Sequence, residues 1–259
     1  MKHMWDPAAQ RFCDGICKDV KVQGNHSIYS DMYSLWLGMP ADDASASNVF
    51  NSTASWGMEH LGDNGMFVYM KALSAYRNVG DGGEASLRAL TKCDQDSWCH
   101  QIRDFDATMT RESGYENDGG TSSHAWGAAT IAATVNNIVG LTQTAPAYAT
   151  FEVRPRLGGL QHVAVTVPSP YGPIRVNATP SLVECTIPCN TVATLCIATL
   201  PSFTSELDVG ERAALHLDGE VISEVTMETR HACVYQVGCG FDGTPRRLEW
   251  VAHSPEWLK

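Results

Sequence analysis

The apolar positions in the N-terminal half of the chain recur at the spacing of amphipathic helices. Over Ile28–Met39 they are four, three, one and three residues apart, which places them on one face of a helix ending near Gly38 or Pro40. The same spacing recurs over Met66–Tyr76. The pattern predicts helices over residues 28–38, 44–61, 66–76, 84–90 and 125–139. The last segment is rich in glycine and alanine, and we expect it to be buried because small side chains let a neighbouring backbone approach closely.

The apolar period changes from about 3.6 residues to about two near residue 142, so the C-terminal half predicts strands. Apolar and polar residues alternate over residues 163–167, 182–187, 193–197 and 234–237. The turn residues of Ser169–Pro173 separate two such stretches and predict a hairpin. Several short strands with turns between them indicate a β-sandwich. We therefore expect a helical domain over residues 1–142 and an antiparallel β-sandwich over residues 143–259.

The charge balance limits the classes of partner. Lys and Arg number 18 against 29 Asp and Glu, a net charge of −11. This balance disfavours nucleic acid and anionic membrane surfaces, and we expect neither as a partner. The sequence has no run of about 18 apolar residues that would cross a bilayer. Met1–Pro7 lacks the apolar core of a signal peptide, and the sequence leaves the compartment open.

The nine cysteines cannot all pair within the chain. Eight are close in sequence to another cysteine and Cys196 is left over: Cys13 and Cys17, Cys93 and Cys99, Cys185 and Cys189, and Cys233 and Cys239. None forms C-x-x-C and no Cys/His set has zinc-finger spacing, so we expect no structural metal. The favoured interpretation is free thiols that fill the cores.

Three triplets match the glycosylation acceptor pattern and favour secretion weakly, because such triplets often arise by chance. They are Asn25-His26-Ser27, Asn51-Ser52-Thr53 and Asn177-Ala178-Thr179.

The segment Phe105–Trp126 is a loop rich in glycine, acids and hydroxyls between two predicted helices. Its carboxylates are Asp106, Glu112, Glu116 and Asp118. His124 and Trp126 stand at the entrance to the next helix, where hydroxyls at 121–123 can cap free N–H groups. Aromatic faces beside polar donors are the usual lining of a sugar subsite. A solvated loop followed by a capped helix fits the composition equally well.

These residues resemble the bacterial-type α-L-rhamnosidases of glycoside hydrolase family 78. Residues 107–112, Ala-Thr-Met-Thr-Arg-Glu, resemble that family's Ala-Thr-Met-Thr-x-Glu segment. Residues 123–127, Ser-His-Ala-Trp-Gly, resemble the Ser/Asn-His-Ala/Pro-Trp-Gly that follows it. Residues 140–155 and 167–174 resemble the passage into its C-terminal sandwich. The blocks occur in family order, and the resemblance extends over about residues 5–200.

The resemblance implies a partial (α/α)6 six-hairpin toroid followed by an antiparallel β-sandwich. Five or six helices are recognisable against twelve in the full ring, so residues 1–142 would be the C-terminal part of the catalytic domain and residues 143–259 the C-terminal sandwich. We expect a truncated N-terminus relative to the family. The family removes terminal α-L-rhamnose from glycosides or polysaccharides with inversion, without a cofactor. Inversion needs two carboxyl groups with room for a water between them.

Carried onto this sequence, the resemblance makes Glu112 the general base and His124 a contact for a sugar hydroxyl. Trp126 would be pocket wall or core, and core is favoured. The family's general acid lies in an acidic motif upstream of this chain, and no equivalent is found. Arg111 stands where the family has an apolar or aromatic residue, and it would favour the carboxylate form of Glu112 or form a surface ion pair.

We therefore expect this chain alone to have little activity. The alternatives are a non-catalytic carbohydrate-binding or structural remnant of the family, and a different glycosidase or a polysaccharide lyase on a helical toroid. A lyase would favour a tyrosine or lysine base.

Overall fold

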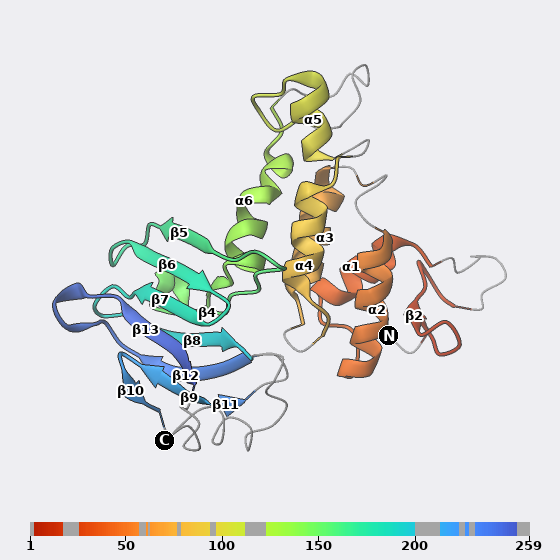
Figure 1. The fold of residues 1–259 in the computed structure, drawn as a ribbon. Coiled ribbons are helices and arrows are strands. Elements are labelled where there is room, and N and C mark those ends of the chain that lie inside the picture. The colour runs from red at the N-terminus through yellow and green to blue at the C-terminus, as the bar shows by residue number, and fades with distance from the viewer. Residues whose placement is uncertain are drawn as a thin grey trace. The chain divides into compact units, whose positions relative to one another are not determined.

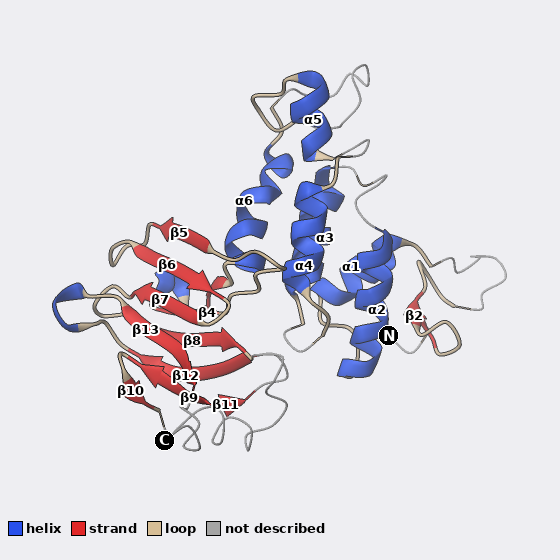
Figure 2. Ribbon diagram, in the orientation of Figure 1, coloured by secondary structure: helices blue, strands red, loops and turns tan. Residues whose placement is uncertain are grey.

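The computed structural model describes residues 3–17, 26–56, 61, 63–76, 79–93, 97–111, 123–199, 213–222, 226–227 and 231–252. The chain forms two compact units, Met1–Asn137 and Ile138–Lys259. Figures 1 and 2 show that the first is largely helical and that the second is built from strands. No described helix has the length and apolar character that a membrane crossing requires.

The first unit begins with a two-stranded hairpin, and helices follow. Its elements are β1 (Trp5–Asp6), β2 (Arg11–Phe12), α1 (Ile28–Trp36), α2 (Asp43–Trp56), α3 (Asp63–Ser74), α4 (Gly82–Thr91), α5 (Trp98–Phe105), the 3₁₀ turn η1 (Ala125–Ala128), α6 (Ala129–Ala133) and the π-helical turn η2 (Thr134–Ile138). The periodicity predicted α1 to α4. It missed α5, and it gave one helix over 125–139 where the chain forms three short helical pieces.

Side-chain caps set the starts of these helices. The Ser27 hydroxyl accepts from the Ser30 N–H before α1, and the Asp81 carboxylate accepts from the Glu84 N–H before α4. Ser97 caps α5 in the same way, through the His100 N–H. Each cap satisfies an N–H that has no partner inside the helix, so these residues fix where each helix begins.

The core of the first unit forms where α1 packs against α2 and α3. Met32, Leu35 and Leu73 are completely buried there. The alanine-rich helix α6 is buried on one face, through Ala129 and Ala133, whereas Ile131 is 70% exposed on the other. The expectation of a buried helix thus holds for one face only.

The second unit contains two sheets. Its strands are β3 (Leu141–Gln143), β4 (Thr150–Val153), β5 (Val163–Val167), β6 (Ile174–Thr179), β7 (Leu182–Thr186), β8 (Val192–Ala198), β9 (Ala213–Leu217), β10 (Glu220–Val221), β11 (Thr226–Met227), β12 (His231–Val237) and β13 (Arg246–Ala252). The short 3₁₀ turns η3 (Pro146–Tyr148) and η4 (Phe241–Gly243) lie between strands. The six-stranded sheet has the order β10-β9-β13-β7-β6-β5, and the five-stranded sheet β11-β12-β8-β4-β3.

The two sheets pack through β8 of one and β7 and β13 of the other. The Trp250 indole N–H of β13 also donates to the Ala198 carbonyl at the end of β8, over 3.0 Å. The predicted turn at 169–173 is present and joins β5 to β6 as an antiparallel hairpin. One pair departs from the expected antiparallel arrangement, because β4 and β8 run parallel. Three strands of the other sheet intervene between them, and this long crossover brings β8 alongside β4 in the same direction.

The free-thiol interpretation is wrong for eight of the nine cysteines. The structure pairs Cys13 with Cys17, Cys93 with Cys99, Cys189 with Cys239 and Cys196 with Cys233, and it leaves Cys185 free and buried. In the second unit one pair follows strand register rather than closeness in sequence. Cys196 on β8 stands directly opposite Cys233 on β12.

The start of the second unit depends on a glycine. Gly140 has φ of 74°, and a Cβ there would lie 1.8 Å from the Arg154 carbonyl oxygen. The Arg154 N–H donates to the Gly140 carbonyl over 3.1 Å. Beyond it, the buried Arg154 and Glu152 side chains form an ion pair at 3.1 Å. Residue 140 must therefore be glycine for the two backbones to approach this closely.

Candidate functional site

Of the three residues that the sequence assigned to the site, the structure places one fully. His124 is half-buried at the entrance to η1. The backbone of Trp126 lies in η1, but its side chain is outside the described part of the chain. Glu112 lies outside the described residues, as do Glu116 and Asp118. The structure therefore describes the frame of the loop, residues 97–111 and 123–137, and not its carboxylates.

Thr110 and His124 join the two ends of this frame. The His124 N–H donates to the Thr110 carbonyl over 2.7 Å, and the Thr110 hydroxyl donates to the His124 carbonyl over 2.8 Å. We call this pair of hydrogen bonds the Thr110–His124 clamp. The clamp fixes His124 opposite the segment that leads into Glu112, which follows Thr110 by two residues.

Gly127 makes room for the clamp. It is buried, and a Cβ at this position would lie 2.9 Å from the Thr110 Cβ and 3.2 Å from the Arg111 carbonyl oxygen. Its N–H donates to the His124 carbonyl over 3.1 Å, which begins η1. The glycine of the Ser-His-Ala-Trp-Gly segment thus has a packing role beside the residues that the resemblance singled out.

Helix α5 supports both ends of the loop frame with buried polar side chains. The Trp98 indole N–H donates to the Gly127 carbonyl over 2.8 Å. The Gln101 side-chain carbonyl accepts from the Arg111 N–H over 3.3 Å, and its backbone carbonyl accepts from the Ala107 N–H. The sequence interpretation missed Trp98 and Gln101. The capping residue Ser97, directly before Trp98, was the available signal for α5.

Arg111 and Asp106 have structural partners. The Arg111 guanidinium lies 5.1 Å from the centroid of the Phe105 ring, a cation–π contact. Asp106 has φ of 48° and forms the C-cap of α5. On the exposed side of α5 the Asp104 carboxylate contacts Arg103 and His100, and these hydrogen bonds lower the pKa of Asp104 to about 2.

Asp31 is a buried carboxylate in the first unit, and its position argues against a catalytic role. Its side chain is fully buried on α1 and accepts two hydrogen bonds from the Arg11 guanidinium of β2, at 2.6 and 3.0 Å. Burial raises the pKa of Asp31 and the Arg11 charge opposes that rise. A carboxylate that is sealed from solvent cannot protonate a leaving group on a substrate, so the pair serves to hold the hairpin to α1.

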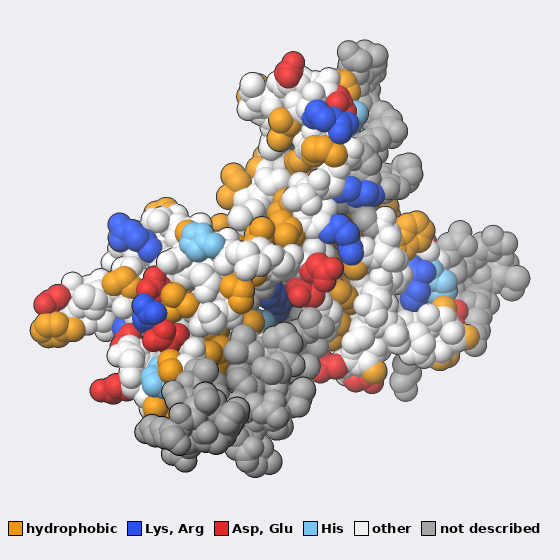
Figure 3. Space-filling model, in the orientation of Figure 1, with side chains coloured by type: hydrophobic (Ala, Val, Ile, Leu, Met, Phe, Trp, Pro, Cys, Tyr) orange, Lys and Arg blue, Asp and Glu red, His pale blue; other side chains and the backbone are white. Residues whose placement is uncertain are grey.

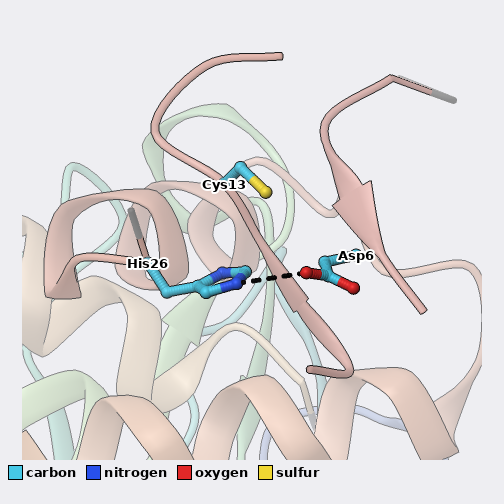
Figure 4. A group of neighbouring side chains, drawn as sticks. All are labelled: Asp6, Cys13 and His26. Atoms are coloured by element: carbon cyan, nitrogen blue, oxygen red, sulfur yellow. Dashed lines mark ion pairs between the residues drawn. The ribbon is translucent and has the colours of Figure 1, made fainter. Parts of the chain in front are cut away.

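One group among the described residues has side chains close enough to share a metal ion. Asp6, Cys13 and His26 converge with ligand atoms within 4.8 Å of one another (Figure 4). Cys13 is bonded to Cys17, so its sulfur is not the thiolate that a metal would bind. His26 instead contacts the Phe12 carbonyl through Nδ1 at 2.9 Å and Asp6 through Nε2 at 3.4 Å. The donor set therefore does not suit a metal, and the group joins the hairpin to the start of α1.

The comparison with known families concerns the first part of the second unit. Residues 140–213 match the family model described as the bacterial alpha-L-rhamnosidase C-terminal domain. This segment is similar to that domain. The match begins at Gly140, and it confirms the resemblance noted from the sequence.

Solved rhamnosidase structures have the same fold as both units. The alpha-L-rhamnosidase from Dictyoglumus thermophilum aligns with a TM-score of 0.68 and 14% identity, over 86% of this chain and 25% of that one. The Streptomyces avermitilis alpha-L-rhamnosidase, complexed with L-rhamnose, aligns with a TM-score of 0.64 and 18% identity, over 92% of this chain and 22% of that one. The chain thus spans a quarter or less of the length of these proteins. None of the curated proteins is similar enough to the chain to count as a match.

Proposed function

We propose that this chain is the C-terminal portion of an inverting α-L-rhamnosidase that removes terminal α-L-rhamnose from glycosides or polysaccharides. The observation that carries the proposal is the rhamnosidase domain match over residues 140–213, adjoining a helical unit that carries the family's motif residues. The likeness to the rhamnose-bound Streptomyces enzyme extends over 92% of the chain and so includes that helical unit.

In this proposal Glu112 is the general base and His124 binds a hydroxyl of the rhamnose ring. Glu112 takes a proton from a water whose oxygen attacks the anomeric carbon, while the glycosidic bond breaks on the opposite face of the sugar. The leaving oxygen takes its proton from an acid that this chain does not supply. The Thr110–His124 clamp supports these roles because it holds His124 beside the segment that leads into Glu112.

The helical unit is, in the same proposal, part of a six-hairpin toroid, with residues 1–142 belonging to the catalytic domain and residues 143–259 to the sandwich. Trp126 would line the sugar pocket or fill the core behind it. Arg111, adjacent to Glu112, would favour the ionised form that a base requires.

The proposal is tested with the chain as it exists, on nitrophenyl α-L-rhamnoside and on a natural rhamnoside. General acid catalysis contributes about 10²–10⁴-fold to rate, so we expect little or no turnover of the natural rhamnoside. Nitrophenolate hardly needs protonation, so residual release of nitrophenol is allowed and should disappear in Glu112→Gln. Turnover of natural rhamnosides at ordinary enzyme rates would overturn the assignment of a missing acid.

The roles of the two residues separate in a complete homologous enzyme that carries this segment. The substitution equivalent to Glu112→Gln should abolish turnover while sugar binding is retained. The substitution equivalent to His124→Ala should raise KM with a smaller effect on kcat. The alternative function is a non-catalytic carbohydrate-binding or structural remnant of the family. Unchanged kcat in the Glu112 variant would favour this alternative.

A further inference from the structure

The outer face of the six-stranded sheet carries a regular array of six side chains. Strand register places Ala164, Asn177 and Glu184 in one row across β5, β6 and β7. Thr166, Arg175 and Thr186 form the next row, two residues further along each strand. Alternation sends all six to one face, because the residues between them on β6 and β7, such as Val176 and Cys185, are buried.

The six side chains surround a cavity. A cavity of about 410 Å³ is lined by the six side chains together with Val165, Val176 and Pro245. Ala164 and the two threonines are short, and they leave space between the longer Arg175, Asn177 and Glu184. Figure 3 shows basic, acidic and histidine side chains gathered over the strands of this sheet. We call this cavity the sheet-face pocket.

The polar groups of the sheet-face pocket are held in place by their neighbours. The Asn177 side-chain oxygen lies 2.5 Å from Nε2 of His162, and its Nδ2 donates to Glu184 Oε2 over 2.9 Å. Glu184 Oε1 lies 3.6 Å from Arg247 Nη1 on the next strand. These contacts fix the orientation of the amide and of the carboxylate before any ligand arrives, which lowers the entropic cost of binding.

Arg175 adds a free donor. Its side chain is exposed at the pocket wall and forms no hydrogen bond or ion pair with another residue that the structure describes. The pocket therefore offers guanidinium and amide N–H donors, carboxylate acceptors and two threonine hydroxyls within one hollow. Neighbouring hydroxyls of a sugar both donate and accept, so they can use all of these groups. Ala164, Pro245 and the threonine methyls supply apolar surface for the C–H face of the ring.

The charges argue for a neutral ligand. The guanidinium of Arg175 and the carboxylate of Glu184 line the same cavity, and Glu184 is also paired with Arg247. An anion would be attracted by Arg175 but repelled by Glu184. A cation would be attracted by Glu184 but repelled by Arg175. A neutral polyol avoids both penalties.

We propose that the sheet-face pocket is a saccharide-binding site for a neutral sugar unit. It lies wholly within the second unit and goes beyond the proposed function, because none of its residues belongs to the rhamnosidase site. Binding there would hold a glycan to the chain independently of hydrolysis.

The test is a titration of the full chain with L-rhamnose, with D-glucose and with anionic D-galacturonate, followed by NMR. The chain is made in a host that lacks N-glycosylation, because Asn177 begins an acceptor triplet. At least one neutral sugar should bind more tightly than the uronate. Ala164→Phe should fill the cavity and Arg175→Ala should remove the free donor, and each should weaken binding about tenfold or more.

Thr179→Phe is the matched control, since Thr179 lies on the same strand and face as Arg175 but does not line the cavity. It should leave binding unchanged, as should Glu112→Gln, which separates this site from the proposed catalytic one. Circular dichroism checks that each variant is folded. Absence of binding by any neutral sugar would overturn the proposal, as would equal binding by the wild type and Ala164→Phe, or a preference for the uronate.

Discussion

At the scale of single residues, glycines show how little space this chain leaves for a side chain where two segments meet. Gly140 and Gly127 each lie against another backbone segment, and each belongs to a block that resembles the rhamnosidase family. Sequence alone marks them as glycines in family motifs. The reason for glycine becomes visible only with the partners, Arg154 in one case and Thr110 in the other.

Gly140→Ala should therefore destabilise the second unit by more than about 2 kcal/mol, since it combines a left-handed backbone with overlap on the Arg154 carbonyl. Gly219→Ala is the control, because its φ is 87° and no atom lies within 4 Å of the added Cβ. The control should lower the free energy of unfolding by only about 1 kcal/mol. Urea unfolding monitored by circular dichroism measures both. Equal losses would show that overlap at Gly140 does not matter.

At the scale of elements, the sequence predicted what is regular and local. Helices α1 to α4 were recognisable from the composition and apolar spacing of their own residues, and the structure adds the caps Ser27 and Asp81. Helix α5 was not predicted, although Trp98, Ile102 and Phe105 have the same four- and three-residue spacing as the apolar residues of α1. It has only eight residues, so this spacing occurs in one short run. The segment 125–139 divides into 3₁₀, α and π turns, which hydrophobic spacing does not distinguish.

The π-helical turn η2 is held by one buried amide. Asn137 Nδ2 donates to the Met70 carbonyl of α3 over 2.8 Å and contacts Ser86 Oγ of α4 at 2.9 Å. Asn137→Ala should lower the free energy of unfolding by about 2–4 kcal/mol, because it leaves buried polar partners unsatisfied. The neighbouring Asn136→Ala, at a half-buried position, should cost less than about 1 kcal/mol. Thermal unfolding, followed by the circular dichroism signal of the helices, compares the two variants. Similar decreases in unfolding temperature would contradict the stabilising role of the Asn137 amide.

The candidate site was predictable as a motif but not as an arrangement. The resemblance of residues 107–112 and 123–127 to the rhamnosidase motifs pointed to Glu112, His124 and Trp126. The clamp partners Thr110 and His124 are 14 residues apart in sequence, and no periodicity relates them. The supporting Trp98 and Gln101 come from the helix that the periodicity missed.

At the scale of the whole molecule, most cysteines form disulfide bonds, whereas composition favoured free thiols in the cores. Four disulfides are typical of chains that fold in an oxidising compartment. Cys185 alone is free, and burial raises its pKa to about 12. A thiol reagent at pH 8 should therefore label nothing in the native chain and one cysteine after unfolding without reductant. Native labelling, or more than one label after unfolding, would contradict this pairing.

The long-range disulfides should matter most for stability. Cys189–Cys239 and Cys196–Cys233 close segments of 50 and 37 residues, against 4 for Cys13–Cys17. Chain entropy assigns about 4 kcal/mol to closing the longer segments and about 2 kcal/mol to the short one. Cys196→Ala/Cys233→Ala should thus lower the unfolding temperature more than Cys13→Ala/Cys17→Ala. A larger decrease in unfolding temperature for Cys13→Ala/Cys17→Ala would show that these disulfides do not stabilise the chain by restricting its unfolded state.

Helix α1 leaves an apolar face uncovered. Tyr29, Tyr33, Trp36 and Leu37 are between 40% and 65% exposed, opposite the buried Met32 and Leu35. If the helical unit is part of a larger toroid, further helices would cover this face. The isolated chain should then associate in sedimentation experiments and bind an apolar dye. Leu37→Lys should reduce both effects more than Ile102→Lys on α5. A monomer that binds no dye would argue against the toroid.

The Thr110–His124 clamp has a consequence for how such a chain can change over time. Because the two ends of residues 112–122 are fastened to each other and to α5, the length of that segment is uncoupled from the packing around it. Doubling a closed segment adds only about 0.6 kcal/mol of entropic cost. Insertions and deletions between the fastened ends therefore leave α5 and α6 where they are. This segment of the sequence can therefore change while the scaffold that carries it stays the same.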